Sequence, residues 1–397
     1  MLHPAAARRR VLSLLLVAYG VPAVLVRAQA PGGVDPAPAG FDLNVGVGTR
    51  FTTDPGLASD DEGADGDSIT DLRAELIGHR RSPRTDWSVR YSPFYTRYRS
   101  NSQLDSINHA LNLDGRYVVT PLSRLSLLER FFYSQDLLQI DAAESAGEAT
   151  ILTSQSNRWR NFTDAAFDAS LSRSLTLQVG ASTRIERFDL DPLVNSEMYS
   201  GRCGIKKQVG REGSISSTYS YSRFDFQGDG LAGAEAQGVD LSWSHGSAER
   251  TEWALSAGVS KVSQGRDREN RLTAAASLHH PFRRYDFISA FRRSLGADSG
   301  VANVTVVQDA HAGISRRLGG RASLTVRGEY GTRDSVLESG DRLALDYAGG
   351  AIQAAIRLNP RLSIAGEARR RRQDVTAGAG EDLTVDTFFL RLDFRIF

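Results

Sequence analysis

The 397-residue sequence contains a single cysteine, Cys203, so it can form no internal disulfide. Its histidines show no spacing typical of a metal site, and there is no GxSxG elbow, HExxH motif or phosphate-binding loop. The 48 Lys and Arg residues are balanced by 47 Asp and Glu, which gives no indication of a nucleic-acid partner. These absences argue against a metalloprotein and a soluble enzyme, so we expect no catalytic residues, no metal and no cofactor.

Long apolar runs are also missing after the first thirty residues, where nothing approaches the ~20 residues that a membrane-spanning helix needs. The one such run, 11–26, follows three arginines and precedes Ala28-Gln29-Ala30. This order is typical of a signal peptide. We therefore predict a signal peptide over residues 1–28, cleaved after Ala28 or else after Ala30, and a flexible lead-in over 29–40.

An exported chain without a second apolar helix can be periplasmic, extracellular or inserted in an outer membrane as a closed barrel. Its composition favours a β-protein, with 37 Gly, 17 Phe and 12 Tyr and a mean hydropathy of −0.31. From Phe41 onward apolar and polar residues alternate with a period of two, as in 41–48, 175–182 and 324–330. One face of each predicted strand is apolar, and the other carries charge.

The connections between these strands alternate between short and long. The short ones have turn composition and cover 120–123, 171–174, 209–212, 318–321 and 358–361. The long, polar ones cover roughly 52–68, 99–105, 134–156, 190–197, 227–236, 263–270, 295–301, 332–341 and 373–382. Short turns that alternate with long loops are typical of a transmembrane barrel with periplasmic turns and extracellular loops.

The same count predicts an antiparallel up-and-down barrel of about 18 strands over residues 41–397. Sixteen strands is the alternative, because 123–133 and 198–209 alternate poorly. An even number places both termini in the periplasm. At Gly349-Gly350 the apolar parity changes, from Leu343, Leu345 and Tyr347 to Ile352 and Ala354, which predicts a β-bulge there.

Two further features give the chain a family resemblance. It ends in an amphipathic segment closed by Phe397, like the signal that outer-membrane barrels present to their assembly machinery, although Phe397 is out of phase with the apolar row 388–396. Repeats such as Pro121-Leu122-Ser123-Arg124-Leu125 and Asn359-Pro360-Arg361-Leu362 accompany the short turns. In these respects the chain resembles the β-barrel porin type 2 group, whose members are linked to exopolysaccharide export. The resemblance implies a barrel fold and polysaccharide as the passenger.

If the apolar row faces lipid, the opposite row lines the lumen. The predicted lumen cations are Arg73, Arg90, Arg116, Arg160, Arg184, Arg202, Lys206, Arg292, Arg327, Arg369, Arg371, Arg391 and Arg395. The predicted lumen acids include Asp114, Asp168, Glu186, Glu329 and Asp393, together with Asp71, Glu75, Asp164, Asp240, Asp286 and Glu367. Two interpretations remain open: the charges pair and stiffen the wall, or the arginines form a selectivity surface for an anionic solute or acidic glycan.

Aromatic residues near the strand ends have two interpretations as well. They form girdles at the membrane interfaces or a sugar-stacking ladder in the lumen, and their shared parity with the apolar row favours girdles. They include Trp87, Tyr91, Tyr95, Trp159, Tyr219, Tyr221, Trp243, Trp253, Tyr285, Phe287 and Tyr330. The acidic stretch 54–67 is either solvated or a calcium site, and 134–156 is the best candidate for an inward constriction.

The sequence thus predicts an outer-membrane channel of a Gram-negative bacterium with an aqueous, Arg-rich lumen. The expected passenger is polysaccharide, with small diffusing solutes as the alternative, and an adhesin or a barrel enzyme is less favoured. Expected partners are membrane lipid and lipopolysaccharide, the barrel assembly machinery, an anionic polysaccharide and periplasmic export components.

Overall fold

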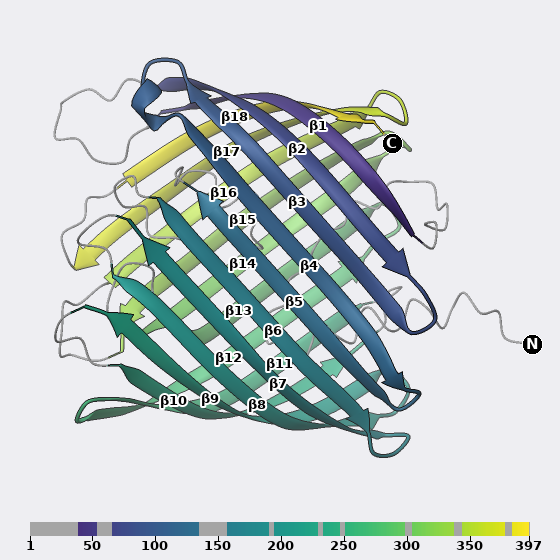
Figure 1. Cartoon of the computed structure of the whole chain (residues 1–397), viewed down its shortest axis with the longest axis vertical. Helices are drawn as coiled ribbons and strands as arrows, with labels where there is room; N and C mark the ends of the chain where they lie inside the picture. Colours follow the sequence, from purple (N-terminus) through teal and green to yellow (C-terminus); the bar gives the residue numbers. More distant parts are fainter. Residues whose placement is uncertain are drawn as a thin grey trace, which may run out of the picture.

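The computed structural model describes residues 39–53, 66–134, 157–189, 194–228, 233–246, 251–297, 304–336, 344–377 and 383–396. The predicted signal peptide, Phe397, the loop 134–156 from its second residue onward and most of the acidic stretch lie outside these ranges. Figure 1 shows the described segments as one tilted set of long strands. Their bounds are β1 Ala39–Thr52, β2 Asp67–Arg81, β3 Thr85–Tyr98, β4 Ser106–Thr120, β5 Ser123–Ser134, β6 Arg158–Ser170, β7 Leu175–Phe188, β8 Asn195–Val209, β9 Gly213–Gln227, β10 Ala234–His245, β11 Glu252–Gln264, β12 Asp267–Pro281, β13 Tyr285–Ala297, β14 Val304–Leu318, β15 Ala322–Ser335, β16 Ala344–Arg357, β17 Leu362–Ala377 and β18 Leu383–Arg395.

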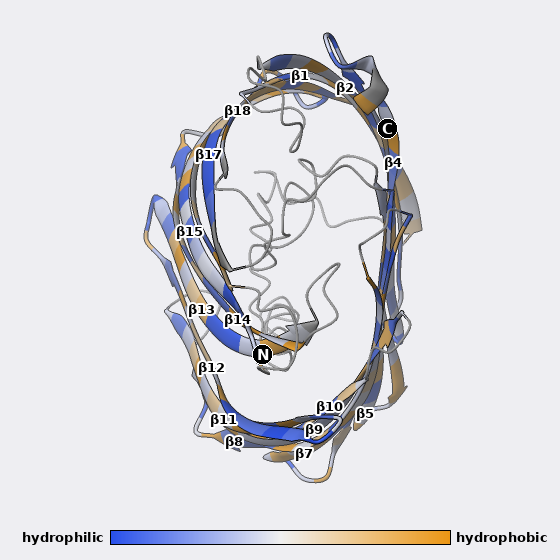
Figure 2. Cartoon of the chain, turned by 90° about the vertical axis from the view of Figure 1, so that its left-hand side faces the viewer, coloured by the Kyte–Doolittle hydropathy of each residue, from blue (hydrophilic) through white to orange (hydrophobic). Residues whose placement is uncertain are grey.

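Each strand pairs antiparallel with the next in sequence, and β18 also pairs with β1, from Asn44 opposite Arg395 to Thr52 opposite Thr387. The sheet therefore closes into the 18-stranded up-and-down barrel that the period-two pattern predicts, and Figure 2 shows the resulting ring. The 16-strand alternative is wrong, because both poorly alternating segments form complete strands, β5 and β8. A helix long and apolar enough to cross a membrane does not occur in the described ranges.

The two ends of the barrel differ, and we call them the turn end and the loop end. The turn end bears the short connections, as well as the start of β1 and the end of β18. Glycines at two of its turns have positive φ, with Gly210 at 66° and Gly319 at 71°, a conformation that few other residues adopt.

At the loop end the prediction of a long polar loop over 263–270 is wrong: β11 and β12 are joined there by the two-residue turn Gly265-Arg266, whose glycine has a φ of 59°.

The two faces of the wall have opposite chemistry. The outer row carries exposed apolar side chains on every strand, such as Val47 on β1, Val259 on β11 and Leu390 on β18. The other row is polar and makes contacts that skip a strand, such as the ion pair from Arg202 on β8 to Asp164 on β6. Contacts across an intervening strand form on the concave side, where side chains converge. The polar row therefore faces the lumen, and the apolar row faces outward.

The aromatic residues named above belong to the outward row by register, which favours girdles over a ladder in the lumen. Trp243 and Trp253 meet edge to face with ring centroids 4.5 Å apart near the turn end. Nearer the loop end the Tyr91 hydroxyl lies 2.9 Å from His109 Nδ1. Glu129 departs from the apolar pattern of the outward row, but Asn161 and Thr163 on β6 both donate hydrogen bonds to its carboxylate.

The predicted bulge at Gly349-Gly350 is wrong. The pairing of β15 with β16 continues without a shift, from Arg327 opposite Ala351 to Arg333 opposite Leu345. Leu345 and Tyr347 therefore share the inward row with Arg333 and do not belong to the apolar outward row. The parity change in the sequence arises because two large apolar side chains point into the barrel, where both are buried. The register shift in this region lies at Ala344/Leu345 instead, at the loop end of β16 and β17.

Candidate functional site

The candidate site is the charged inner wall. The strand register places the predicted lumen cations and acids on the inward row: Arg73 lies opposite Gly46, Arg116 opposite Asp86, Lys206 opposite Thr176 and Asp168 opposite Gln178. Most of the cations have an acidic partner among the described residues, as with Arg90 and Glu75 at 3.3 Å. Others make different contacts; the Arg73 guanidinium lies 5.4 Å from the Phe94 ring centroid.

On one wall a single carboxylate receives two arginines. Arg158 and Arg160 on β6 both form ion pairs with Glu186 on β7, the latter at 2.9 Å. Arg158 and Glu186 are each only 1% exposed. Buried charges of this kind are stable only when they are paired and hydrogen-bonded. Two guanidiniums thus converge on one carboxylate in this cluster.

Beside that cluster Arg202 crosses a strand to reach Asp164. Its Nη1 lies 2.7 Å from Asp164 Oδ2 and its Nη2 lies 3.1 Å from Oδ1, a bidentate arrangement. The arginine passes over Gly180 on β7, where an added Cβ would lie 2.7 Å from Arg202 Cζ. Because Gly180 has no side chain, the Arg202 side chain can cross β7 and link β8 to β6.

A second cluster of the same kind lies on β13–β16. Arg292 on β13 and Arg333 on β15 contact Asp309 on β14 at 2.9 and 2.8 Å, and all three are largely buried. The Tyr347 hydroxyl donates a third contact to Asp309 Oδ1 at 2.8 Å. Arg371 on β17 lies 5.0 Å from the Tyr347 ring centroid, a cation–π distance. In strand order β14–β16 lie about half of the ring away from β6–β7, so the two clusters occupy opposite walls.

Between β15 and β2 the inner charges alternate in sign. Arg327 pairs with Glu367 and Arg369 with Glu329, each at 3.1 Å and each across β16. Arg391 pairs with Asp393 at 2.7 Å, and Arg395 pairs with Asp42 across the β18–β1 junction that closes the barrel. These pairs fit the interpretation that lumen charges stiffen the wall, and they supply no excess of either sign.

A third part of the wall, on β8–β12, is rich in hydroxyl groups. Hydroxyl pairs link neighbouring strands there: Ser200 with Ser222 at 2.8 Å, Ser214 with Ser244 at 2.7 Å and Ser216 with Ser242 at 2.6 Å. Figure 2 shows β8–β11 together along one side of the ring. The register of β9 with β10 places Ser214, Ser216, Ser242 and Ser244 of this hydroxyl arc on the inward row.

Several of these features were not predicted from the sequence. Asp309 and Arg333, the centre of the second cluster, were not among the predicted site residues. Phe94, Phe132 and Phe224 are buried on the inward row, although aromatic residues were expected on the outside. The alternating Ser and Gly residues of β9 and β10 are a visible signal for the hydroxyl arc, whereas nothing local marks Asp309.

Nothing in the described ranges gathers three or more His, Cys, Asp or Glu side chains in a way that could hold a metal ion. No model of a known protein family matches the sequence, and no curated protein matches it significantly.

Solved structures offer a more distant comparison. The chain is 10% identical to a BenF-like porin from Pseudomonas fluorescens Pf-5, with 92% of this chain and 100% of that chain covered and a TM-score of 0.49. It is 9% identical to OccK2 (OpdF) of Pseudomonas aeruginosa, with 90% and 97% covered and a TM-score of 0.49. At such scores the barrel assignment depends on the strand pairing itself and not on these similarities.

Proposed function

We propose that the protein is an outer-membrane channel whose inner wall favours anions. The outward apolar row and its aromatic girdles suit insertion in lipid, and a closed barrel satisfies its backbone hydrogen bonds there. A ring of 18 strands is wide enough to surround an aqueous lumen. With its turn end in the periplasm, the loop end meets lipopolysaccharide, and β18 is the strand that engages the assembly machinery.

The observation that carries the proposal is the convergence of two arginines on one acid in each of the two buried clusters. Glu186 holds Arg158 and Arg160, and Asp309 holds Arg292 and Arg333. Each cluster thus concentrates guanidinium groups at one place on the inner wall, where the low-dielectric surroundings reduce the screening of their attraction for an anion. Because the clusters lie on opposite walls, an anion between them is attracted from both sides.

For the passenger we infer an acidic glycan, which an export channel would carry with the help of periplasmic components. Carboxylate groups on a sugar chain would meet the arginine clusters, while its hydroxyl groups would meet the hydroxyl arc of β8–β12. General diffusion of small solutes is the second candidate. It is supported by the balanced ion pairs between β15 and β2, which carry no net charge.

The test is the conductance of the refolded barrel in a planar bilayer under a salt gradient. We expect an anion-selective reversal potential and a block by oligogalacturonate but not by a neutral dextran fragment of the same length. Replacing one arginine in each cluster, Arg160→Gln with Arg333→Gln, should abolish most of the selectivity, and the corresponding lysine variant should retain it. Arg293→Gln with Arg372→Gln on the outward row is the matched control. A cation-selective pore, or a correctly folded barrel that does not conduct, would overturn the proposal.

A further inference from the structure

A basic pocket lies at the turn end, away from the two lumen clusters. It is formed by Phe282–Asp286, where β12 joins β13, and by Arg316–Gly319, where β14 ends, and its volume is about 740 Å³. The two connections are tied together, because the Arg317 amide donates to the Arg284 carbonyl at 3.3 Å. Within the first connection the Phe282 amide donates to the Tyr285 carbonyl at 2.6 Å. The pocket is therefore built on fixed backbone and not on isolated surface side chains.

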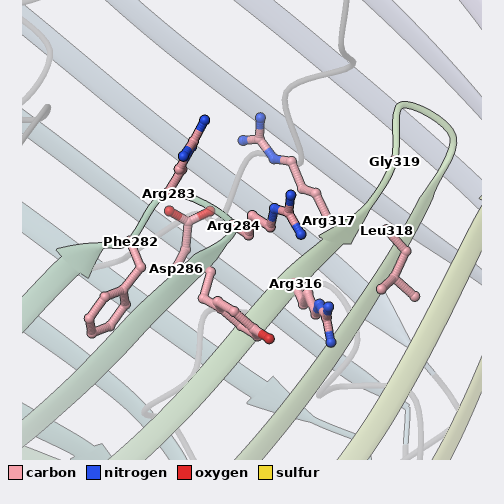
Figure 3. Close-up of a pocket in the computed structure, with 9 residues that line it drawn as sticks. Phe282, Arg283, Arg284, Asp286, Arg316, Arg317, Leu318 and Gly319 are labelled. Carbon is pink, nitrogen blue, oxygen red and sulfur yellow. The ribbon is translucent and has the colours of Figure 1, made fainter.

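The charge of this pocket is strongly one-sided. Four arginines line it against one acid, Asp286, and Figure 3 shows Arg316 directed away from Arg283 and Arg317 at the ends of the two connections. The arginines are Arg283, Arg284, Arg316 and Arg317. Among the residues that the structure describes, none of the four forms an ion pair. Four like charges around one cavity repel each other, and a bound anion would relieve that repulsion.

The outward side of the pocket is apolar. The Arg316 guanidinium lies 5.0 Å from the Tyr285 ring centroid, and Phe282 and Leu318 are 53% and 46% exposed. Tyr285 and Arg316 face each other at the end of an outward row that continues to Phe287 and Ile314. The pocket thus offers cations at its mouth and an apolar wall leading toward the middle of the strands. That combination fits an amphiphile with an anionic head better than it fits a free inorganic anion.

We propose that the pocket binds the headgroup phosphate of an anionic phospholipid in the leaflet that faces the turn end. Guanidinium forks make bidentate hydrogen bonds to phosphate oxygens, and four of them are among the residues that line the cavity. The first acyl chain would lie along Tyr285, Phe287 and Ile314. The inference depends on the membrane location proposed above, and it adds a lipid site that is separate from the lumen.

The test uses the purified barrel in a neutral detergent with short-chain phosphatidylglycerol, short-chain phosphatidylcholine or inorganic phosphate as the probe. We expect phosphatidylglycerol to bind, and phosphatidylcholine and phosphate to bind at least about tenfold more weakly, as expected when both the charge and the apolar wall contribute. Arg284→Gln with Arg316→Gln should weaken phosphatidylglycerol binding by at least about tenfold. Arg173→Gln with Arg361→Gln, which removes two exposed turn-end arginines elsewhere, should leave it unchanged.

Three outcomes would overturn the lipid site: equal binding of phosphate and phosphatidylglycerol, equal binding of the two lipids, or an unaffected Arg284/Arg316 variant. Heat-modifiable migration on a gel shows that each variant is folded. Conductance of the same preparations separates this inference from the proposed function. A barrel that conducts anions but does not bind phosphatidylglycerol would refute the lipid site alone, whereas binding without conductance would refute the channel.

Discussion

The hydroxyl of Tyr347 on β16 donates a hydrogen bond to Asp309 on β14 at 2.8 Å, although β15 lies between the two strands. The contact is possible because the tyrosine ring lies over Gly331 on β15, where an added Cβ would be 2.3 Å from Tyr347 Cε1. Arg202 crosses Gly180 in the same manner to reach Asp164. Glycines on the inward row thus permit side chains to join strands that are not neighbours.

The first prediction concerns this crossing. Gly331→Ala should displace the Tyr347 ring and break its bond to Asp309, with an expected loss of about 1–3 kcal/mol of stability because Asp309 is buried. Tyr347→Phe should produce a loss of similar size, and the double variant should cost little more than either single one. The measurement is urea unfolding in detergent or lipid. Gly328→Ala on the same strand is the control, since only a backbone oxygen at 3.8 Å lies near its added Cβ. Strictly additive single effects would contradict the crossing mechanism.

The second prediction tests which face of β7 meets lipid. Leu177 shares the outward row with Ala169 and Ile205, whereas Gln178 points inward and donates to Asp168 Oδ1 at 3.1 Å. Leu177 lies near the turn end of β7, so Leu177→Arg should impair assembly by less than the about 2–4 kcal/mol that an arginine facing lipid costs at mid-depth. Gln178→Arg should be tolerated, since it places a cation beside an acid. Heat-modifiable mobility on a gel reports assembly in each case. Equal assembly of the two variants would contradict the assignment of Leu177 to the lipid face and Gln178 to the lumen face.

The third prediction uses the native cysteine. Cys203 is exposed, lies near the middle of β8 and pairs on the outward row with Val179 and Tyr219. In a bilayer we expect no labelling by a charged thiol reagent, because lipid around the outward row excludes the reagent. Labelling should appear after unfolding, and a small apolar maleimide, which can enter the lipid, should react before unfolding. Rapid labelling of the folded, inserted protein by the charged reagent would place Cys203 in water.

The sequence predicted those features of the barrel that depend on local pattern. Period two and the alternation of connection lengths were sufficient for the strand count, because each strand reveals its two faces and its ends through its own residues. Errors arose where that pattern was weak. Leu345 and Tyr347 were assigned to the outward row because they are apolar, and this assignment required a bulge that the structure does not contain. The charged residues around the tight Gly265-Arg266 turn were mistaken for a long polar loop.

The composition of the candidate site was accessible from the sequence, but its arrangement was not. Parity alone assigned Arg160 and Glu186 to one row. Which acid forms an ion pair with which arginine depends on the stagger between strands and on the wall curvature that brings β14 close to β16. Asp309 is the clearest example: Arg292, Arg333 and Tyr347 contact it from three other strands, and Tyr347 is 38 residues away in sequence.

The junction between β1 and β18 joins the first described strand of the chain to the last. Neither β1 nor β17 can complete its hydrogen bonds until β18 has been made, so seventeen finished strands would still present two unpaired edges. A chain that stops just before β18 loses two strand interfaces, β17–β18 and β18–β1, and not one. Termination just before β18 should therefore be as damaging to accumulation of the protein as a much larger deletion.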